Sequence, residues 1–586
     1  MTTKPTDKST GDSTSADSIS AGIEPILEGV SSANLDAHLD WCSGVRRDTG
    51  GPGEEKMVEY IVETLKKEGV PVTVHEHDAY LSYPRHAVLE VLAPERLNIR
   101  CLTHSFAAST GSNGLSGSLR YLPEKNMKDG AGRIALVDGL AMPIEVLQAS
   151  RAGVQALIFS NADWYIHNMI VTTIWGGSPT PEQQERLPTV PVVSISNEDG
   201  KKLKELLESG PVELRVTTEV ETGWKRVKLP EVRIPGSADT DEFVLVGGHY
   251  CSWEVGITDN STGIAALLEI ARIMWQNRSS LERNVRVAWW PGHSHGRYAG
   301  STWYADTFFE DLGRNCVAYH NIDSPGVKGA TKYILRHTSA EIEEFGRQAI
   351  ESFTEQRDPE VHRPSRAADQ SFLANGIPSC SLYSFLPDGH PDRKPWTGGC
   401  AGAWWWHTEH DTRDKADTTI LAKDVRLSLG FVARLVNTPL FPFDFHHLAL
   451  ETKEFITDAA EAAEGKLDMD RTLELADQLI AATEGLNERL AASGGQDAAR
   501  NNETLRRLAR TLLPLVFTSD GRYVHEAADI TPMMSTHRAS MYPGINRAFG
   551  LADLEGTVEH GFLLTKLHRQ VNRFNDRLER AVELAG

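Results

Sequence analysis

Five segments between Phe243 and Gly326 decide the fold. They read FVLVGGHY (243–250), ITDNSTGIAALLEIARIMW (257–275), NVRVAWWPG (284–292), GSTWYADTFFEDL (300–312) and CVAYHNIDSPG (316–326). The first, third and fifth are short apolar runs typical of strands, whereas the second and fourth have helical spacing. Such alternation predicts an α/β fold with a mostly parallel sheet sandwiched by helices. The runs Val244–Val246 and Val285–Trp289 fit strands that are covered on both sides.

The flanking sequence has a different character on each side of this core. Residues 23–69 read as mainly helical, and residues 98–222 carry short strands separated by Gly and Pro. A strand–helix–strand unit, RIALVDG (133–139), IEVLQASRA (144–152) and QALIFSNA (155–162), lies inside that stretch and indicates an inserted module. After PLFPFDF (439–445) the chain is dominated by long amphipathic helices, which predicts a helical bundle.

Composition limits the partners and the compartment. The 586 residues have a formal net charge of −21, which argues against nucleic acid and anionic membranes as partners. No run of 18 apolar residues occurs, and residues 1–22 are polar, so we expect a disordered tail and no membrane segment. Six scattered cysteines without a Cys-x-x-Cys pair indicate reduced thiols and a cytoplasmic protein.

Candidate ligands lie where the predicted strands end. His249 closes the first strand, Asp323 closes the strand 316–323, and Asp259 precedes the helix that follows the first strand. His407 lies in AWWWHTEHDTRDKAD (403–417), and His293 follows the strand 284–290. Ligands of parallel α/β sheets bind outside the carboxyl ends of the strands. Imidazole and carboxylate groups meeting there could bind a first-row divalent metal, and Asp259 could bridge two ions.

Several of these segments together resemble the co-catalytic zinc aminopeptidase family, in particular the branch of glutamate carboxypeptidase II and transferrin receptor. They are GGHY (247–250), TDNSTGIAALLEIAR (258–272), GHSHGRYAGS (292–301), NIDSPG (321–326) and HTEHDTRDKAD (407–417). DAYLSYP (78–84) and the module at 133–162 resemble that branch's protease-associated insert. PLFPFDF with the helices and MYPGINRAFGL (541–551) resembles its C-terminal dimerisation domain.

The resemblance implies a domain order and a ligand set. It implies a metallopeptidase-like domain (23–97 and 223–450), a protease-associated insert (98–222) and a helical dimerisation domain (451–586) that forms a homodimer. It implies one or two zinc ions on His249, Asp259, Asp323 and His407, with Asp259 as the bridging carboxylate. Asp411 and Asp417 are expected to order the loop after His407, and Asp369 to lie in a segment that shapes the pocket.

The sequence departs from the family at three positions. Cys251 replaces the usual Asp two residues after the first His, and His293 and Ser294 replace two consecutive Glu, a general base and a metal ligand. His293 could supply the missing base or ligand, since imidazole does both. Alternatively, one metal could perform different chemistry on a small molecule, or the site could be inactive. His295 is expected to hydrogen-bond across its turn, and Cys251 could be a soft ligand, a nucleophile or an inert thiol.

The favoured interpretation is a metal-dependent hydrolase that cleaves an amide-type C–N bond in a small molecule or short peptide. We expect His293 to be catalytic and to contribute to the metal shell. Cys251, Trp406 and Arg366 are the candidate substrate contacts, with Arg366 as a possible carboxylate anchor. The alternatives are a metal-dependent lyase acting on a small metabolite and a catalytically silent dimeric binding protein.

Overall fold

A computed structural model describes residues 23–493, 495–528 and 541–586. The expected tail at 1–22 lies outside the described residues. Three parallel strands form one end of the sheet, in the order β11 (Cys316–Asn321), β9 (Phe243–His249) and β10 (Asn284–Trp290). Neighbouring residues of β9 face opposite sides of the sheet, as the pleat requires. Because both sides are covered, every residue of β9 is buried, and the α/β prediction is confirmed.

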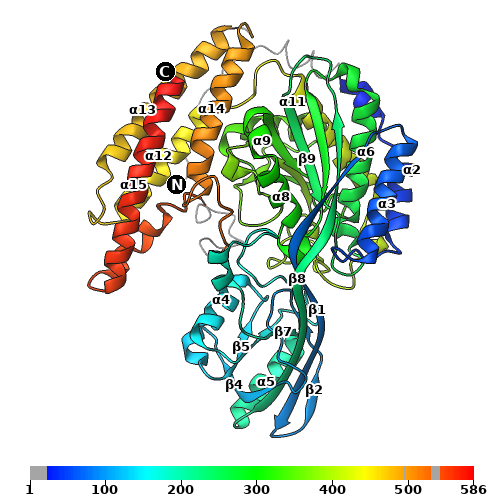
Figure 1. Cartoon of the computed structure of the whole chain (residues 1–586), viewed down its shortest axis with the longest axis vertical. Coiled ribbons are helices and arrows are strands. Elements are labelled where there is room, and N and C mark those ends of the chain that lie inside the picture. Colours follow the sequence, from blue (N-terminus) through cyan, green and yellow to red (C-terminus); the bar gives the residue numbers. More distant parts are fainter. Residues whose placement is uncertain (1–22, 494, 529–540) are drawn as a thin grey trace.

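Helices cover both faces of this sheet. Val244 and Val246 pack into the core that contains α6 (Thr262–Gln276), together with α2 (Ser32–Cys42) and α3 (Pro52–Lys67) at the outer edge (Figure 1). The helix α11 (Thr418–Asn437) contributes to the same core. On the other face, Phe243 and Leu245 join a cluster with side chains of α8 (Ala299–Thr307) and α9 (Phe309–Asn315).

Two long strands connect the sheet domain to the inserted lobe. The strands β1 (Thr73–Ala93) and β8 (Glu213–Ile234) pair antiparallel along their length, and the C-terminal part of β8 pairs with β10. Both run continuously from the sheet domain into the lobe at the bottom of Figure 1. The expected domain boundary at 222/223 therefore falls inside a strand, and the two modules share one sheet.

The inserted lobe is a small α/β unit. Its parallel strands are β4 (Leu115–Tyr121), β5 (Ile134–Asp138), β6 (Ala156–Ser160) and β7 (Val192–Ile195), with β2 (Leu97–Ile99) and β3 (Leu102–Thr103) at the edges. The predicted strand–helix–strand unit is β5, α4 (Pro143–Ala152) and β6. A second helix, α5 (Asn197–Ser209), packs on the same small sheet.

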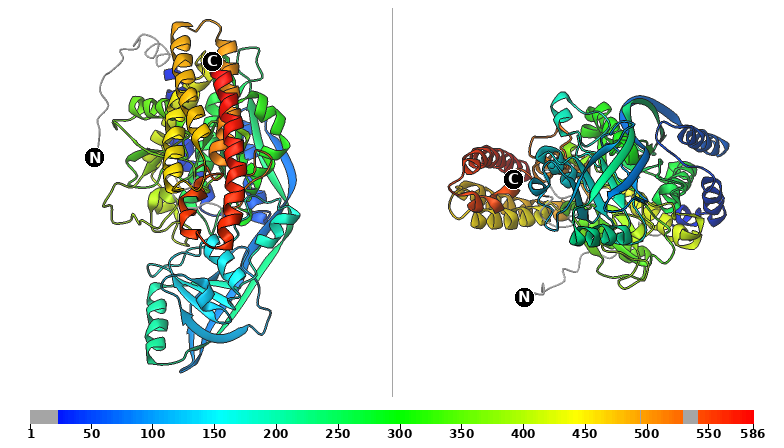
Figure 2. Two further views of the ribbon diagram at one scale, coloured as in Figure 1. Left: turned by 90° about the vertical axis from the view of Figure 1, so that its left-hand side faces the viewer. Right: turned by 90° about the horizontal axis from the view of Figure 1, so that it is seen from below.

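Four long helices lie beside the sheet domain. They are α12 (Phe445–Ala462), α13 (Asp470–Ser493), α14 (Ala498–Phe517) and α15 (Val558–Ala585), and they run side by side (Figure 2). The first begins at Phe445, ahead of the expected start of this domain at 451. None of the helices in the described residues is long and apolar enough to cross a bilayer.

Arg510 docks the helical domain onto the sheet domain. Its guanidinium donates to four main-chain carbonyls, those of Leu312 (3.2 Å), Gly313 (3.1 Å), Cys316 (2.6 Å) and Gly376 (2.5 Å). Leu312 and Gly313 lie in α9, Cys316 begins β11, and Gly376 follows the turn Leu373–Asn375. One side chain of α14 therefore fixes three segments of the sheet domain.

We expect Arg510→Met to destabilise the protein by at least about 3 kcal/mol, because four carbonyls lose a charged donor. Thermal unfolding followed by circular dichroism measures this as a lower midpoint temperature. Arg507→Met, at an exposed position of the same helix, is the control and should leave the midpoint unchanged. Equal midpoints for the two variants would contradict this account of the docking.

Candidate metal centre and active site

The ends of two parallel strands bring the first candidate ligands together. His249 is the last residue of β9, Asp323 follows β11, and Asp259 lies in the turn Ile257–Ser261 before α6. His249 Nε2 lies 3.0 Å from Asp259 Oδ1 and 3.7 Å from Asp323 Oδ1. The predicted meeting of these groups at one edge of the sheet is therefore present in the structure.

The protonation of His249 follows from its other ring nitrogen. Nδ1 lies 3.0 Å from the main-chain oxygen of Cys251, and since a carbonyl only accepts, Nδ1 carries the hydrogen. In the neutral ring Nε2 then holds a lone pair. This atom is buried and makes no hydrogen bond, yet it faces two carboxylates. A lone pair facing carboxylate oxygens is repulsive unless a cation lies between them.

His407 repeats this arrangement on the other side of Asp259. Its Nδ1 donates to the main-chain oxygen of Asn168 (2.8 Å), and its Nε2 lies 3.2 Å from Asp259 Oδ2. Asn168 belongs to the inserted lobe, and its own amide nitrogen donates back to the oxygen of His407 (2.8 Å). The insert thus orients a candidate ligand of the sheet domain, which is how partners of metal-bound imidazoles act.

Asp259 therefore presents one carboxylate oxygen to each of two imidazoles. Positive charge stabilises this cluster of carboxylates and ring nitrogens. Burial opposes ionisation, but contact with Asp259 and Asp323 raises the pKa of His249 well above its ordinary value. Burial likewise opposes the charged form of Asp259, and His249 and His407 hold its pKa well below the usual range. Nitrogen and oxygen donors that converge in this way fit a divalent metal, which would take the place of the ring proton.

Asp411 holds the turn that presents Asp259. Its carboxylate accepts hydrogen bonds from the amide nitrogens of Thr258 (2.9 Å) and Asp259 (3.0 Å) and from the Thr258 hydroxyl (2.7 Å). Burial raises the pKa of Asp411 to about 7. Asp417 caps α11 through the amide nitrogens of Thr419 and Ile420. Neither carboxylate lines the cavity described below.

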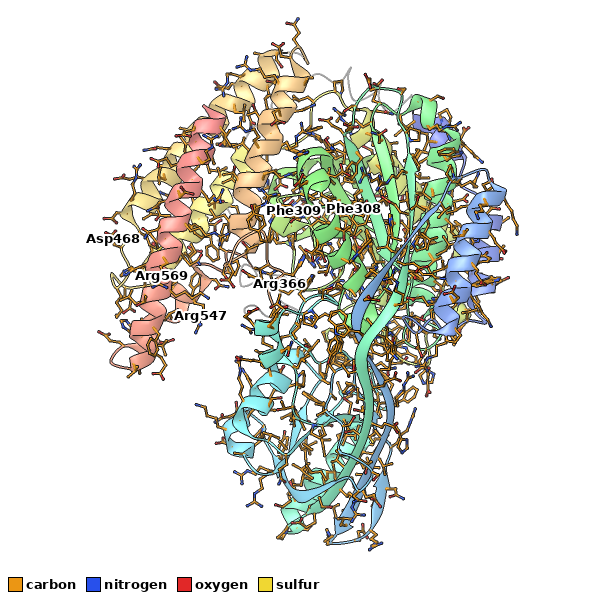
Figure 3. All side chains as sticks on the ribbon, in the orientation of Figure 1. Phe308, Phe309, Arg366, Asp468, Arg547 and Arg569 are labelled. Carbon is orange, nitrogen blue, oxygen red and sulfur yellow. The ribbon has the colours of Figure 1, made fainter. Side chains whose placement is uncertain are left out.

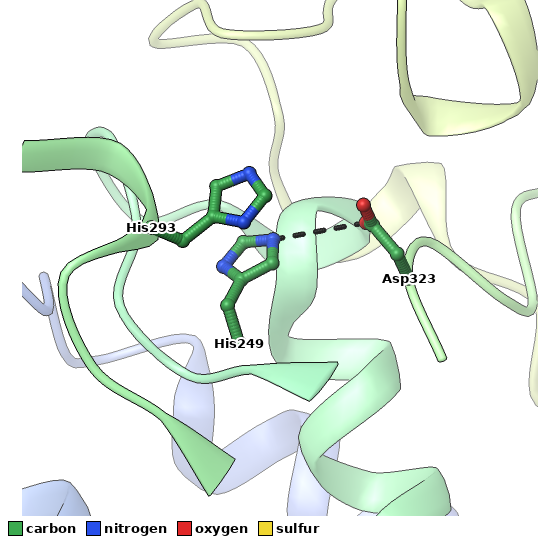
Figure 4. Close-up of side chains that lie close together, drawn as sticks. All are labelled: His249, His293 and Asp323. Atoms are coloured by element: carbon green, nitrogen blue, oxygen red, sulfur yellow. Dashed lines mark ion pairs between the residues drawn. The ribbon is translucent and has the colours of Figure 1, made fainter. Parts of the chain in front are cut away.

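His293 lies directly on His249. The two rings stack with centroids 3.8 Å apart and planes 16° apart, and the carboxylate of Asp323 lies to one side of them (Figure 4). Ligand atoms of these three residues all lie within 4.8 Å of one another. His293 Nδ1 lies 2.8 Å from Asp369 Oδ2. The sequence did not indicate this partner, because Asp369 is 76 positions away in a loop.

The two residues after His293 in the sequence lie on different sides of its turn: Ser294 lines the cavity and His295 does not. Ser294 lines the cavity, and its hydroxyl oxygen lies 3.9 Å from the Cys251 sulfur. Burial would raise the pKa of the Cys251 thiol, but His249 and His293 lower it to about 6. His295 packs between Trp253 and Tyr83, and burial lowers its pKa to about 4. Its Nδ1 contacts Thr49 Oγ1 (3.4 Å), so this ring faces away from the cluster.

A cavity opens onto the cluster. Asp259, His293, Asp323 and His407 line its floor, and Trp406 stacks on His407 with ring centroids 3.9 Å apart. Other walls are mostly apolar and come from both the sheet domain and the insert: Met142, Met169, Ile170, Trp253, Tyr383 and Phe385. Cys251 lies beneath the floor, fully buried, and is not part of the lining.

Arg366 does not line this cavity. Its guanidinium donates to the oxygen of Phe517 (2.6 Å) and to Glu526 (3.0 Å), between the sheet domain and the C-terminal helices (Figure 3). The expected substrate anchor is therefore a contact between domains. Its charge is turned away from the cavity because the carbonyl and carboxylate of the helical domain satisfy it. The arginine that does line the cavity is Arg336, at the end of β12 (Lys332–Arg336).

Comparison with known proteins identifies the sheet domain. Residues 232–432 match the model of peptidase family M28, a span that includes all five candidate ligands. This part of the sheet domain is therefore similar to peptidase family M28. Relatives of the M28 domain include a probable glutamate carboxypeptidase VP8 of Zea mays, 23% identical over 70% of this chain and 67% of the relative. A probable leucine aminopeptidase 2 of Aspergillus oryzae is 25% identical over 62% of this chain and 73% of the relative.

Solved structures show the same fold. A peptidase M28 precursor from Shewanella amazonensis superposes with a TM-score of 0.59 at 18% identity, covering 73% of this chain and 98% of that chain. An aminopeptidase from Aneurinibacillus sp. strain AM-1 superposes with a TM-score of 0.55 at 20% identity, covering 70% and 95%. The chain therefore shares the fold of these peptidases.

We expect His249→Ala to lower zinc affinity by at least about 100-fold, because an inward-facing ligand is lost. Competition with a chromophoric chelator and elemental analysis measure this. His320→Ala is the matched control: His320 is also a buried histidine on a parallel strand of the sheet, but its nitrogens contact Cys380 O and Ser428 Oγ. Full zinc occupancy in His249→Ala would contradict the ligand set.

Proposed function

We propose that this chain is a zinc-dependent hydrolase that cleaves an amide-type C–N bond in a short peptide or small molecule. The family match and the relatives named aminopeptidase and glutamate carboxypeptidase support metal-dependent peptide hydrolysis. The observation that carries the proposal is Asp259, whose two carboxylate oxygens face the imidazoles of His249 and His407 at the floor of a cavity.

Zinc is the divalent metal that the M28 family and the nitrogen and oxygen donors support. His249, Asp259 and Asp323 would hold one ion, which is the three-ligand pattern of catalytic zinc sites. For a second ion we assign just Asp259 and His407 among the described residues, since Ser294 stands where the family resemblance expects a Glu. We therefore propose one tightly held zinc per chain. When bound, zinc would act as a Lewis acid on the substrate carbonyl.

His293 is the proposed proton-transfer group, in place of the family's Glu. Its Nε2 would accept a proton from the attacking water as the water oxygen bonds to the carbonyl carbon. The C–N bond then breaks, its electron pair goes to nitrogen, and His293 returns the proton to that nitrogen. The products are a carboxylic acid and an amine, and His293 is again neutral.

The cavity walls support a small, partly apolar substrate. Trp253, Trp406 and Phe385 offer aromatic surface in the cavity wall, and Met169 and Ile170 of the insert add apolar surface. Aromatic side chains bury large area on a ligand at low entropic cost. Trp406 is the residue we expect to contact the group next to the scissile bond, because it lies against His407.

We expect His293→Ala to lower kcat/KM by about 10²- to 10⁴-fold on aminoacyl 4-nitroanilides, the range that a general base contributes. Zinc content should stay at one per chain. His295→Ala, in the same turn but directed at Trp253, should keep most of the activity. A zinc-loaded wild type that cleaves no member of the panel, nor any dipeptide, would contradict the hydrolase proposal.

We also propose a homodimer that forms through the helical domain. Val558 and Phe562 are 70% and 74% exposed, and they are four residues apart on α15, so they share one face. Phe549, in the segment before α15, is also exposed. Large apolar side chains exposed together are typical of protein interfaces.

Light scattering after gel filtration should give a dimer for the wild type and a monomer for Val558→Asp with Phe562→Asp, because two charges would be buried at the interface. Arg577→Asp, at the other end of α15, is the control and should remain dimeric. A wild-type monomer at micromolar concentration would contradict the proposed assembly.

A reducing compartment such as the cytoplasm is proposed for the protein. All six cysteines lie in the described residues, and each is a free thiol. Five of the six are buried, so they pack as small apolar side chains. This usage supports the cytoplasmic location expected from the sequence.

A further inference from the structure

Asp369 is a buried carboxylate that stands behind His293. It is 1% exposed and lies in the loop between β13 (Glu360–His362) and the turn Leu373–Asn375. Oδ2 lies 2.8 Å from His293 Nδ1, and Oδ1 accepts a hydrogen bond from the Ser301 hydroxyl (2.8 Å). Each carboxylate oxygen of Asp369 therefore contacts another side chain. The carboxylate holds His293 and Ser301 in fixed positions relative to each other.

The contact with Asp369 decides which nitrogen of His293 is free. An ionised carboxylate only accepts hydrogen bonds, so Nδ1 carries the hydrogen and Nε2 carries the lone pair. Among the described residues Nε2 has no hydrogen-bond partner, and the His293 side chain lines the cavity. The stacking on His249, 3.8 Å between centroids, fixes the plane of the ring.

We propose that Asp369 is a positioning residue that fixes the tautomer of His293 and presents its Nε2 to the cavity as a proton acceptor. This proposal rests on the hydrolase function above, and it explains how an imidazole can act where the family resemblance expects a Glu. With Nδ1 held by Asp369, Nε2 is the ring atom that can take the proton of the attacking water. When Nε2 gives that proton to the leaving nitrogen, the original tautomer is restored.

The surroundings of Asp369 hold it in place from three segments. The Ser301 hydroxyl, at the start of α8, also lies 2.9 Å from the hydroxyl of Ser371. Ser371 in turn accepts a hydrogen bond from the indole nitrogen of Trp175 (3.1 Å), and Trp175 belongs to the inserted lobe. A carboxylate fixed in this way has little freedom to rotate, which is what orienting an imidazole requires.

Asp369→Asn tests the proposal without knowledge of the substrate. The Asn side chain can donate from its amide nitrogen to Nδ1, which moves the ring hydrogen to Nε2 and gives the wrong tautomer. Diethyl pyrocarbonate, which attacks an unprotonated imidazole nitrogen, is the probe, and mass spectrometry of peptides from the full-length zinc-loaded protein reports the rate at His293. We expect Asp369→Asn to slow carbethoxylation of His293 at least about 10-fold, with zinc content unchanged.

Asp424→Asn is the matched control. Asp424 is also a buried carboxylate, held by Gly326 N and Ser384 Oγ, and its variant should leave the His293 rate unchanged. Equal His293 rates in Asp369→Asn and wild type would overturn the proposal. So would protection of wild-type His293 by zinc, which would make Nε2 a metal ligand, or an unreactive wild-type His293, or loss of zinc in Asp369→Asn.

The second experiment measures kcat and KM on any aminoacyl 4-nitroanilide that the wild type cleaves. Asp369→Asn should lower kcat by about 10²- to 10⁴-fold with little change in KM, because proton transfer and not binding is impaired. A change in KM alone would overturn the proposal. Failure of the wild type to cleave any substrate would contradict the hydrolase function, whereas the carbethoxylation result would still decide the role of Asp369.

Discussion

The site depends on one carboxylate that faces two imidazoles. Asp259 presents one oxygen to His249 and the other to His407, and each imidazole has its hydrogen fixed on the far nitrogen by a main-chain carbonyl. Acceptor atoms are thus turned toward acceptor atoms, an arrangement that persists only with positive charge between them. The surrounding structure, from the turn held by Asp411 to the strand ends, keeps these acceptors in place.

The three modules of the chain contribute to that constraint together. The sheet domain supplies the five candidate ligands, but the carbonyl that orients His407 comes from Asn168 in the insert. The insert is tied to the sheet domain by the continuous strands β1 and β8, so its position is set by main-chain pairing along the full strand length. The helical domain is fixed by Arg510 and by Arg366, whose charges are satisfied by groups of the opposite domain. A change in how the domains dock should therefore alter the geometry of the candidate metal centre.

Much of the fold could be predicted from the sequence because apolar runs alternate with helical spacing around Phe243–Asp323. The meeting of His249 and Asp323 followed from the parallel order of β9 and β11. The partner of His293 could not be predicted, since Asp369 lies in a loop where no periodicity fixes its place. For Arg366 the sequence predicted a position near the pocket. The direction of its guanidinium depends on Phe517 in the helical domain, which is far away in the sequence.

Charge balance links the carboxylates that line the cavity to the carboxylate behind His293. His293 and Ser294 occupy the two positions at which the family resemblance leads us to expect Glu. Asp259 and Asp323 are the only acidic side chains among the described residues that line the cavity. Their two negative charges are balanced by one divalent ion. Asp369 is a further buried carboxylate, outside the cavity lining, and its Oδ2 lies 2.8 Å from Nδ1 of His293. An imidazole held by a carboxylate, beside two carboxylates that one divalent ion would balance, is therefore consistent with the charges of the groups that the structure brings together.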